Sequence, residues 1–305
     1  MPYLIIALVL IFLVIAPTLI SFFTCFYHKQ RPPKEEFEIP EGDIYLPHKM
    51  QMVAWMKQAR SLPHEEITIT SYDGLKLYGK YYQCNPGGII ELMFHSYRGN
   101  SERDLCGGIE RCFKLGHNVL MVDQRACGKS EGRVITFGVK ESRDCKAWID
   151  YTVARFGKDV RILLCGVSMG ASTVMMAAGR EMPENVIGVL ADCGYSSQRE
   201  IIRLVTKNMK LPPKFMYLYI KLSASLLGGF NIDEYPPIQA LKNCKVPVMI
   251  IHGEADDFVP CYMAQECYDA CASRKCLVTI PNAGHGLAYM IAPDKYIASM
   301  KEFFE

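Results

Sequence analysis

The sequence lacks an excess of charge of either sign. Lys and Arg number 34 against 32 Asp and Glu, the formal net charge is +2, and both signs are interspersed along the chain. Proteins that bind nucleic acid usually carry a basic patch or tail, because the phosphate backbone attracts positive charge. The charge pattern therefore indicates no nucleic-acid partner.

Signatures of metal and cofactor sites are also missing. The sequence contains no His-Glu-x-x-His motif and no phosphate-binding glycine loop. Its 13 cysteines are odd in number and scattered over predicted strands and helices, unlike a disulfide framework. The closest group has no Cys-x-x-Cys pair, which disfavours a zinc site; its members are Cys261, Cys267, Cys271 and Cys276. We expect no metal and no organic cofactor.

Charged residues are absent from residues 3–27, where only three hydroxyl side chains interrupt the apolar run. A helix of these 25 residues would be about 37 Å long, against about 30 Å for the hydrocarbon core of a bilayer. The run predicts a transmembrane anchor over residues 1–28 and makes the membrane bilayer an expected partner. A cleaved signal peptide or a buried core helix is the alternative.

The residues after this run bear on its orientation. Lys29, Arg31 and Lys34 follow it and no basic residue precedes it, so the positive-inside bias places the rest of the chain in the cytoplasm. The opposite orientation stays open. Residues 29–63 are expected to form a charged, proline-containing linker and a helix leading into the main domain.

Short apolar runs alternate with helix-like segments over the rest of the chain, which is typical of an α/β fold with a mostly parallel sheet covered on both faces. Before them, two alternating segments flank Asp73-Gly74 and predict a β-hairpin. The expected strands are 89–94, 118–122, 161–165, 186–191, 246–251 and 277–280, and the expected helices are 103–115, 139–156, 168–181, 261–272 and 287–304.

One interval is too long for a single crossover. About 50 residues separate the strand that ends near Asp192 from the strand that begins at Val246. We expect a lid insertion over about 195–240, made of two helices over 198–210 and 214–228. The second is strongly apolar, and it is expected to pack on the domain, to line an acyl-binding pocket or to rest on the bilayer.

A Gly-x-Ser-x-Gly stretch, Gly166 to Gly170, lies between a predicted strand and a predicted helix. This context predicts a nucleophile elbow, a sharp turn that exposes Ser168 at the carboxyl edge of the sheet. Glycines are needed there because side chains two residues away would collide with the neighbouring strand and helix.

Other polar stretches follow predicted strands at the same edge. Asp256 and Asp257 follow one strand, His285 follows the last, and the loop after His95 follows the first strand of the parallel part. The order Ser168, Asp256, His285 is that of an α/β-hydrolase triad. Spacing alone does not choose between Asp256 and Asp257 as the acid.

From about residue 64 onward the chain resembles the α/β-hydrolases of the serine aminopeptidase-like and dienelactone-hydrolase-like group, particularly the membrane-anchored members. The stretch 123–130 also resembles the family's Asp-x-Arg-x-x-Gly-x-Ser motif. The resemblance implies the α/β-hydrolase fold over residues 64–305, and His-Gly-x-x-Asp-x-x-Val-Pro selects Asp256 as the acid.

The roles follow from the chemistry of acyl transfer. Ser168 would attack a carbonyl, His285 would accept its proton, and Asp256 would orient the imidazole. The backbone N–H of Met169 would form one half of an oxyanion hole, and the resemblance points to Tyr97 for the other half, although Ser96 replaces the family's usual glycine. Arg98 and Tyr195 are the candidate substrate-binding residues.

The sequence therefore predicts a membrane-anchored serine hydrolase. It would cleave an ester, thioester or amide of a small-molecule or lipid-like acyl substrate through an acyl-enzyme. A serine peptidase is one alternative, for which Glu200 is a weak candidate to bind a substrate amine. A hydrolase-fold binding module without turnover is the other. The natural substrate and the oligomeric state are left open.

Overall fold

A computed structural model describes residues 2–31 and 35–305 of the chain; residues 32–34 of the predicted linker lie outside the described residues. The sheet has eight strands in the order β1-β2-β4-β3-β5-β6-β7-β8. They are β1 (Glu65–Thr70), β2 (Lys76–Tyr82), β3 (Ile90–Phe94), β4 (Asn118–Val122), β5 (Ile162–Val167), β6 (Val186–Asp192), β7 (Val248–Gly253) and β8 (Lys275–Ile280).

Most of the sheet is parallel. The hairpin strand β1 pairs with β2, and β2 pairs with β4, both in antiparallel fashion, whereas every other neighbouring pair is parallel. All five residues of β3 and of β4 are buried, as expected for strands covered on both faces. The predicted α/β-hydrolase architecture, a mostly parallel sheet flanked by helices, is confirmed.

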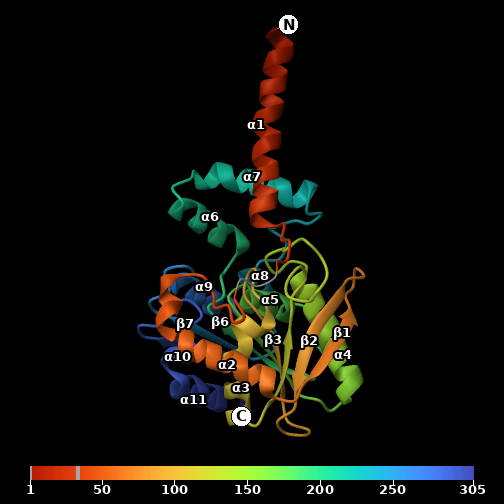
Figure 1. Ribbon diagram of the computed structural model, residues 1–305, viewed down its shortest axis with the longest axis vertical. Helices are drawn as coiled ribbons and strands as arrows, with labels where there is room; N and C mark the ends of the chain where they lie inside the picture. The colour runs from red at the N-terminus through yellow and green to blue at the C-terminus, as the bar shows by residue number, and fades with distance from the viewer. Residues whose placement is uncertain (1, 32–34) are drawn as a thin grey trace.

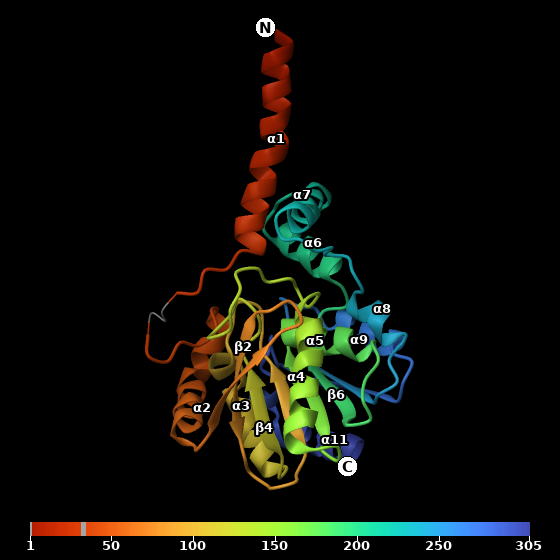
Figure 2. The same cartoon turned by 90° about the vertical axis from the view of Figure 1, so that its right-hand side faces the viewer.

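Helices cover both faces of the sheet (Figures 1 and 2). One buried apolar cluster joins the sheet to α4, α5, α8 and α9, and a second joins the opposite face to α2, α3, α10 and α11. The bounds of these helices are α2 (Lys49–Ser61), α3 (Ser101–Lys114), α4 (Glu141–Phe156), α5 (Met169–Ala178), α8 (Pro237–Leu241), α9 (Tyr262–Ala270), α10 (Ala288–Ile291) and α11 (Pro293–Phe304).

Local chemistry decides several helix ends. The side chain of Asn100 accepts a hydrogen bond from the Arg103 N–H and caps the start of α3, which begins two residues before the predicted start. The single helix predicted over 287–304 is divided into α10 and α11. Pro293 explains the break, because proline lacks an N–H and disfavours helical backbone at the preceding residue.

The interval 195–240 contains the helices α6 (Gln198–Asn208) and α7 (Pro213–Leu226). They lie at one end of the sheet, beside the base of α1 (Pro2–Cys25), which projects away from the sheet along the long axis of the molecule (Figures 1 and 2). The side chains of Phe22 and Phe26 are buried in an apolar cluster with α7 residues, and the Phe26 ring packs edge-on at 5.2 Å from the Phe230 ring.

The predicted transmembrane anchor is not supported. Over the part of the chain that the structure describes, no helix combines the length and the apolarity needed to cross a membrane. The last turns of α1 contact the rest of the protein on one side, since Thr18, Ser21 and Phe22 are buried. The residues that follow α1 are also packed, since Phe26 is buried and Tyr27 forms an antiparallel bridge with Val134.

Candidate active site

Ser168 occupies a strained turn between β5 and α5. Its backbone has φ 56° and ψ −117°, a conformation that non-glycine residues rarely adopt. A Cβ atom on Gly166 would lie 2.2 Å from the carbonyl carbon of Gly170, and one on Gly170 would lie 2.1 Å from the Phe94 carbonyl oxygen. No larger residue can occupy either position without moving the backbone, which is why this turn needs two glycines.

The structure brings Ser168, His285 and Asp256 together at the carboxyl edge of the sheet. His285 Nε2 lies 2.9 Å from Ser168 Oγ, and His285 Nδ1 lies 2.7 Å from Asp256 Oδ2. All three residues are buried. Asp257, the alternative acid, is exposed to solvent. The two aspartates are adjacent in sequence, and the path of the loop after β7 turns Asp256, the residue that the family motif selects, toward His285.

The Asp256 carboxylate is held by several donors. Backbone N–H groups of Phe258 and Val259 donate to its Oδ1 at 3.0 and 2.8 Å. Burial alone would raise the pKa of Asp256, but hydrogen bonds from His252 and His285 outweigh it and hold the pKa at about 2. The carboxylate is therefore ionised at neutral pH and can stabilise positive charge on His285.

His252 is a further buried residue beside this site, and its role was not apparent from the sequence. Its Nε2 lies 2.7 Å from the Val259 carbonyl oxygen and 3.4 Å from Asp256 Oδ2. Burial lowers the pKa of His252, but the contact with Asp256 raises it by more than burial lowers it, so the pKa is raised overall. The sequence contains one indication of a role for His252, because this residue begins the stretch that contains Asp256. Its contact with the Asp256 carboxylate, however, depends on how the loop after β7 folds back.

The two predicted oxyanion donors lie near this turn. Met169 is the first residue of α5, where backbone N–H groups have no partner within the helix. Tyr97 lies in a tight turn closed by a 3.2 Å hydrogen bond from the Gly99 N–H to the Ser96 carbonyl oxygen. The hydroxyl of Ser96 donates to Asp104 on α3, so the side chain that replaces the family's usual glycine is directed toward that helix.

The side chains of Arg98 and Tyr195 are hydrogen-bonded to backbone carbonyls elsewhere in the protein. The Arg98 guanidinium donates to the carbonyl oxygens of Thr24 and Tyr27 at 2.8 and 3.1 Å, at the carboxyl end of α1. The Tyr195 hydroxyl donates to the Phe137 carbonyl oxygen at 2.9 Å. Neither is among the described residues that line the cavity beside Ser168. A positive side chain suits a helix carboxyl end, where unpaired carbonyls carry partial negative charge.

We therefore expect Arg98→Ala to affect stability more than substrate choice. Loss of two hydrogen bonds from a half-buried guanidinium should lower the free energy of unfolding by about 1 kcal/mol and the Tm by about 2 °C. Thermal unfolding checks this, with the exposed Lys158→Ala as the charge-matched control. A selective loss of activity toward anionic p-nitrophenyl succinate relative to the acetate would instead place Arg98 in substrate binding.

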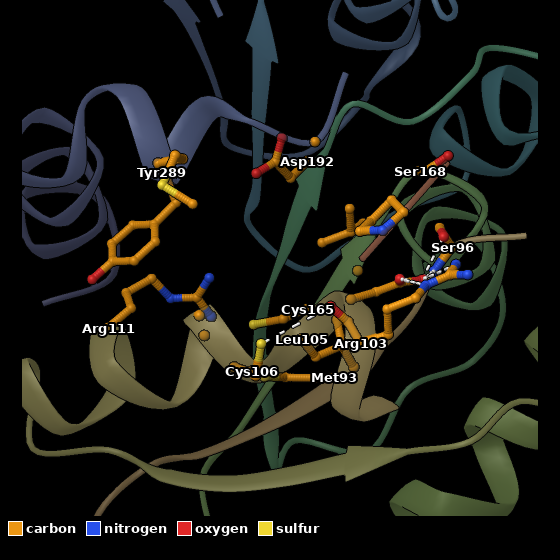
Figure 3. A pocket seen from close by; sticks show the side chains of 18 of the residues that line it. Met93, Ser96, Arg103, Leu105, Cys106, Arg111, Cys165, Ser168, Asp192 and Tyr289 are labelled. Atoms are coloured by element: carbon orange, nitrogen blue, oxygen red, sulfur yellow. Dashed lines mark hydrogen bonds and ion pairs between the residues drawn. The ribbon is translucent and has the colours of Figure 1, made fainter. Parts of the chain in front are cut away.

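A cavity of about 120 Å³ adjoins Ser168 and His285. Its walls come from β3, α3, β5, β6, the carboxyl-terminal helices and the segment before β1, from which Tyr45, Met52 and Trp55 contribute. Figure 3 shows the labelled lining residues around it. No residue of α6 or α7 is among the described residues that line it, so α7 does not form a wall of this cavity.

Within the described residues, one group of side chains has metal-ligand chemistry. Ligand atoms of Cys193, Asp256 and His285 lie within 4.8 Å of one another. However, Asp256 and His285 are in direct hydrogen-bond contact at 2.7 Å. Two ligands bound to one zinc ion at about 2.0–2.2 Å lie about 3.3 Å apart. The arrangement is therefore that of a hydrogen-bonded pair rather than a preformed metal site.

Known proteins resemble this chain in sequence. A sequence profile described as the alpha/beta hydrolase family matches residues 107–299. The uncharacterized protein YqkD of Bacillus subtilis is 25% identical over 192 residues, which cover 63% of each chain. The uncharacterized protein YfhR of Escherichia coli K12 is 26% identical over 274 residues, covering 86% of this chain and 83% of YfhR.

Solved structures share the fold. The Pyrococcus furiosus esterase Pf2001 has a TM-score of 0.65 at 22% identity, covering 92% of this chain and all of the esterase chain. Est1E from Butyrivibrio proteoclasticus, solved with ferulic acid bound, has a TM-score of 0.60 at 22% identity, covering 78% of this chain and 97% of Est1E. At these identities the likeness concerns the fold alone.

Proposed function

This chain belongs to the alpha/beta hydrolase family, and on that premise we propose that it is a serine hydrolase that cleaves carboxylic esters through an acyl-enzyme on Ser168. One observation carries the proposal. A hydroxyl, an imidazole and a carboxylate stand in line, separated by 2.9 and 2.7 Å, beside a cavity. Such an arrangement activates a serine hydroxyl, which is a weak nucleophile by itself.

In the first half-reaction, Ser168 Oγ attacks the ester carbonyl carbon while His285 Nε2 takes the hydroxyl proton. Asp256 holds Nδ1–H and stabilises the imidazolium. The oxygen that becomes negative accepts hydrogen bonds from the N–H groups of Met169 and Tyr97. When the tetrahedral intermediate collapses, the carbon–oxygen bond to the alcohol breaks and the alcohol leaves with the proton from His285.

The second half-reaction uses water in place of the serine. His285 takes a proton from a water molecule, whose oxygen attacks the acyl carbon. The bond to Ser168 Oγ then breaks, and His285 returns the proton to that oxygen. The free acid leaves, and no metal or redox cofactor takes part in these steps.

Two further observations guide the substrate class. The cavity holds about 120 Å³, and its wall includes Met93, Leu105 and Leu190, which suits a short, partly apolar group. Among structures that share the fold, Pf2001 is described as an esterase, which favours esters over peptides. In this proposal residues 64–305 form the hydrolase unit, with 195–240 as an insertion. Placement in the serine aminopeptidase-like or dienelactone-hydrolase-like subgroup rests on motif resemblance.

Labelling by a fluorophosphonate probe tests the proposal directly. We expect the folded protein to be labelled at Ser168, because an activated serine attacks the phosphorus centre and displaces fluoride. Ser168→Ala should abolish the label. Ser196→Ala is the matched control, since Ser196 is fully buried one strand away and its hydroxyl has no partner among the described residues. No label on folded wild type, or label that survives Ser168→Ala, contradicts the proposal.

A further inference from the structure

The cavity beside Ser168 has a polar end. Arg111 from α3, Asp192 at the end of β6, Tyr289 from α10 and Tyr296 from α11 all line it, together with Ser168. All four of these residues are buried. In Figure 3 Arg111 and Tyr289 lie on the side of the cavity away from Ser168 and Ser96, and Asp192 lies between Tyr289 and Ser168. Most of the remaining wall is apolar, so polar groups here need a specific explanation.

Tyr296 holds this polar end together. Its hydroxyl donates to Asp192 Oδ2 at 3.0 Å. The guanidinium carbon of Arg111 lies 5.5 Å from the centre of the Tyr296 ring. The Tyr289 ring packs edge-on against the Tyr296 ring, with 5.5 Å between the ring centres. Asp192, Arg111 and Tyr289 are therefore gathered around one fully buried side chain.

Each of these three residues keeps one buried polar atom without a partner in the part of the chain that the structure describes. The atoms are Oδ1 of Asp192, Nε of Arg111 and the hydroxyl oxygen of Tyr289. A buried donor or acceptor left unpaired loses its hydrogen bonds to water without replacement, which is unfavourable. The three residues that bear these atoms line one end of a cavity that reaches the nucleophile, which points to polar groups that a ligand satisfies.

The charges at this end restrict the ligand. The positive charge of Arg111 is already paired with Glu91, which also accepts a 2.8 Å contact from His117 Nδ1. Asp192 would repel an anion. Burial raises the pKa of Asp192 to about 6, although the hydrogen bond from Tyr296 acts in the opposite direction. Net positive charge is therefore not available to bind a carboxylate or a phosphate.

A neutral hydroxyl offers both the donor and the acceptor that these groups lack. Its O–H can donate to Asp192 Oδ1, while its oxygen accepts from the Arg111 Nε–H or the Tyr289 hydroxyl. We propose that the part of the substrate that enters this cavity carries a hydroxyl group, recognised by Asp192, Arg111 and Tyr289. The inference rests on the proposed esterase function, since it concerns the substrate of the same site.

Matched pairs of esters test this inference and distinguish the two sources of the hydroxyl. The acyl arm compares methyl 6-hydroxyhexanoate and 8-hydroxyoctanoate with methyl hexanoate and octanoate. The alcohol arm compares 6-hydroxyhexyl and 8-hydroxyoctyl acetate with hexyl and octyl acetate. We expect kcat/KM, measured by proton release, to be about 10-fold higher for the hydroxylated ester in one arm, because a site built for a hydroxyl discriminates against its absence.

Variants then test whether the preference for hydroxylated esters comes from the polar end of the cavity. Tyr289→Phe and Asp192→Asn should each bring the ratio of hydroxylated to plain ester close to one. Tyr82→Phe is the matched control and should keep the wild-type ratio, since the Tyr82 hydroxyl is also buried without a partner among the described residues but is not among those lining the cavity.

Two outcomes overturn the inference while leaving the proposed function intact. One is ester hydrolysis with a ratio within about twofold of one in both arms. The other is a preference that survives both Tyr289→Phe and Asp192→Asn. If folded wild type hydrolyses none of the esters and Ser168 is not labelled by the fluorophosphonate probe, the proposed function itself fails, and the inference fails with it.

Discussion

Replacing Ser168 by alanine is expected to lower kcat for ester hydrolysis by about three to six orders of magnitude. The variant lacks the oxygen that forms the acyl-enzyme, and His285 Nε2 loses the group that lies 2.9 Å away. What activity remains should come from the cavity and the oxyanion donors acting on water. Steady-state kinetics of wild type and variant, compared at equal folded concentration by circular dichroism, measure the effect.

The same kinetics distinguish a triad from independent side chains. Groups that act as one unit give strongly non-additive losses. We expect the double variant Ser168→Ala/His285→Ala to be no slower than Ser168→Ala alone, within about threefold. If the two losses multiplied instead, Ser168 and His285 would contribute separately, and the 2.9 Å contact between them would not be a catalytic one.

The second large effect concerns stability. Glu91 on β3 is completely buried, pairs with the Arg111 guanidinium and contacts the His117 imidazole. Replacing Glu91 by alanine leaves a buried guanidinium without its counter-charge. Removal of one partner of a buried ion pair typically destabilises by about 3–5 kcal/mol. We therefore expect Glu91→Ala to lower the free energy of unfolding by that amount in denaturant titrations.

Two comparisons separate this effect from general loss of packing. Asp150→Ala breaks an exposed pair with Lys146, and it should change the free energy of unfolding by less than about 1 kcal/mol. Glu91→Met/Arg111→Met removes both charges, and it should recover much of the loss because no buried charge is left unpaired. If Glu91→Ala were as stable as wild type, the assigned role of Glu91 would be contradicted.

The contribution of Glu91 to the free energy of unfolding should depend on pH in a direction that its pKa determines. Burial raises the pKa of Glu91, but Arg111 and the hydrogen bond from His117 outweigh it and hold the pKa at about 2. In an unfolded chain the pKa of a glutamate is about 4.3. Ionised Glu91 therefore stabilises the fold above about pH 4.3, and this contribution is lost as the pH falls toward about 2. The stability gap to Glu91→Gln should shrink over that interval.

Much of the fold was predictable from local pattern. Buried parallel strands appear as continuous apolar runs, and β3 and β4 lie close to where such runs were predicted. The elbow at Ser168 was predictable for a similar reason, because a tight strand-to-helix turn needs glycine at Gly166 and Gly170. These features depend on residues close together in the chain.

Features that depend on distant partners were not predictable. Arg98 and Thr24 are 74 positions apart, and nothing near Arg98 in the sequence indicates that it holds the end of α1. The apolar amino-terminal run predicted a membrane helix because hydropathy does not reveal that Phe26 meets Phe230. The pairing of Glu91 with Arg111 is hidden in the same way, since the two residues lie 20 positions apart and belong to different elements.

The sequence by itself determined the order of the elements and the residue types at the carboxyl ends of the strands, because periodicity, glycine and turn chemistry act over a few residues. Only the tertiary structure decided that Arg111, Asp192 and Tyr289 meet at one end of a cavity, and it places Asp256, the acid that motif resemblance selected, against His285. The physical reason is that burial, pairing and hydrogen bonding depend on which distant segments the sheet places side by side, and no local pattern encodes that placement.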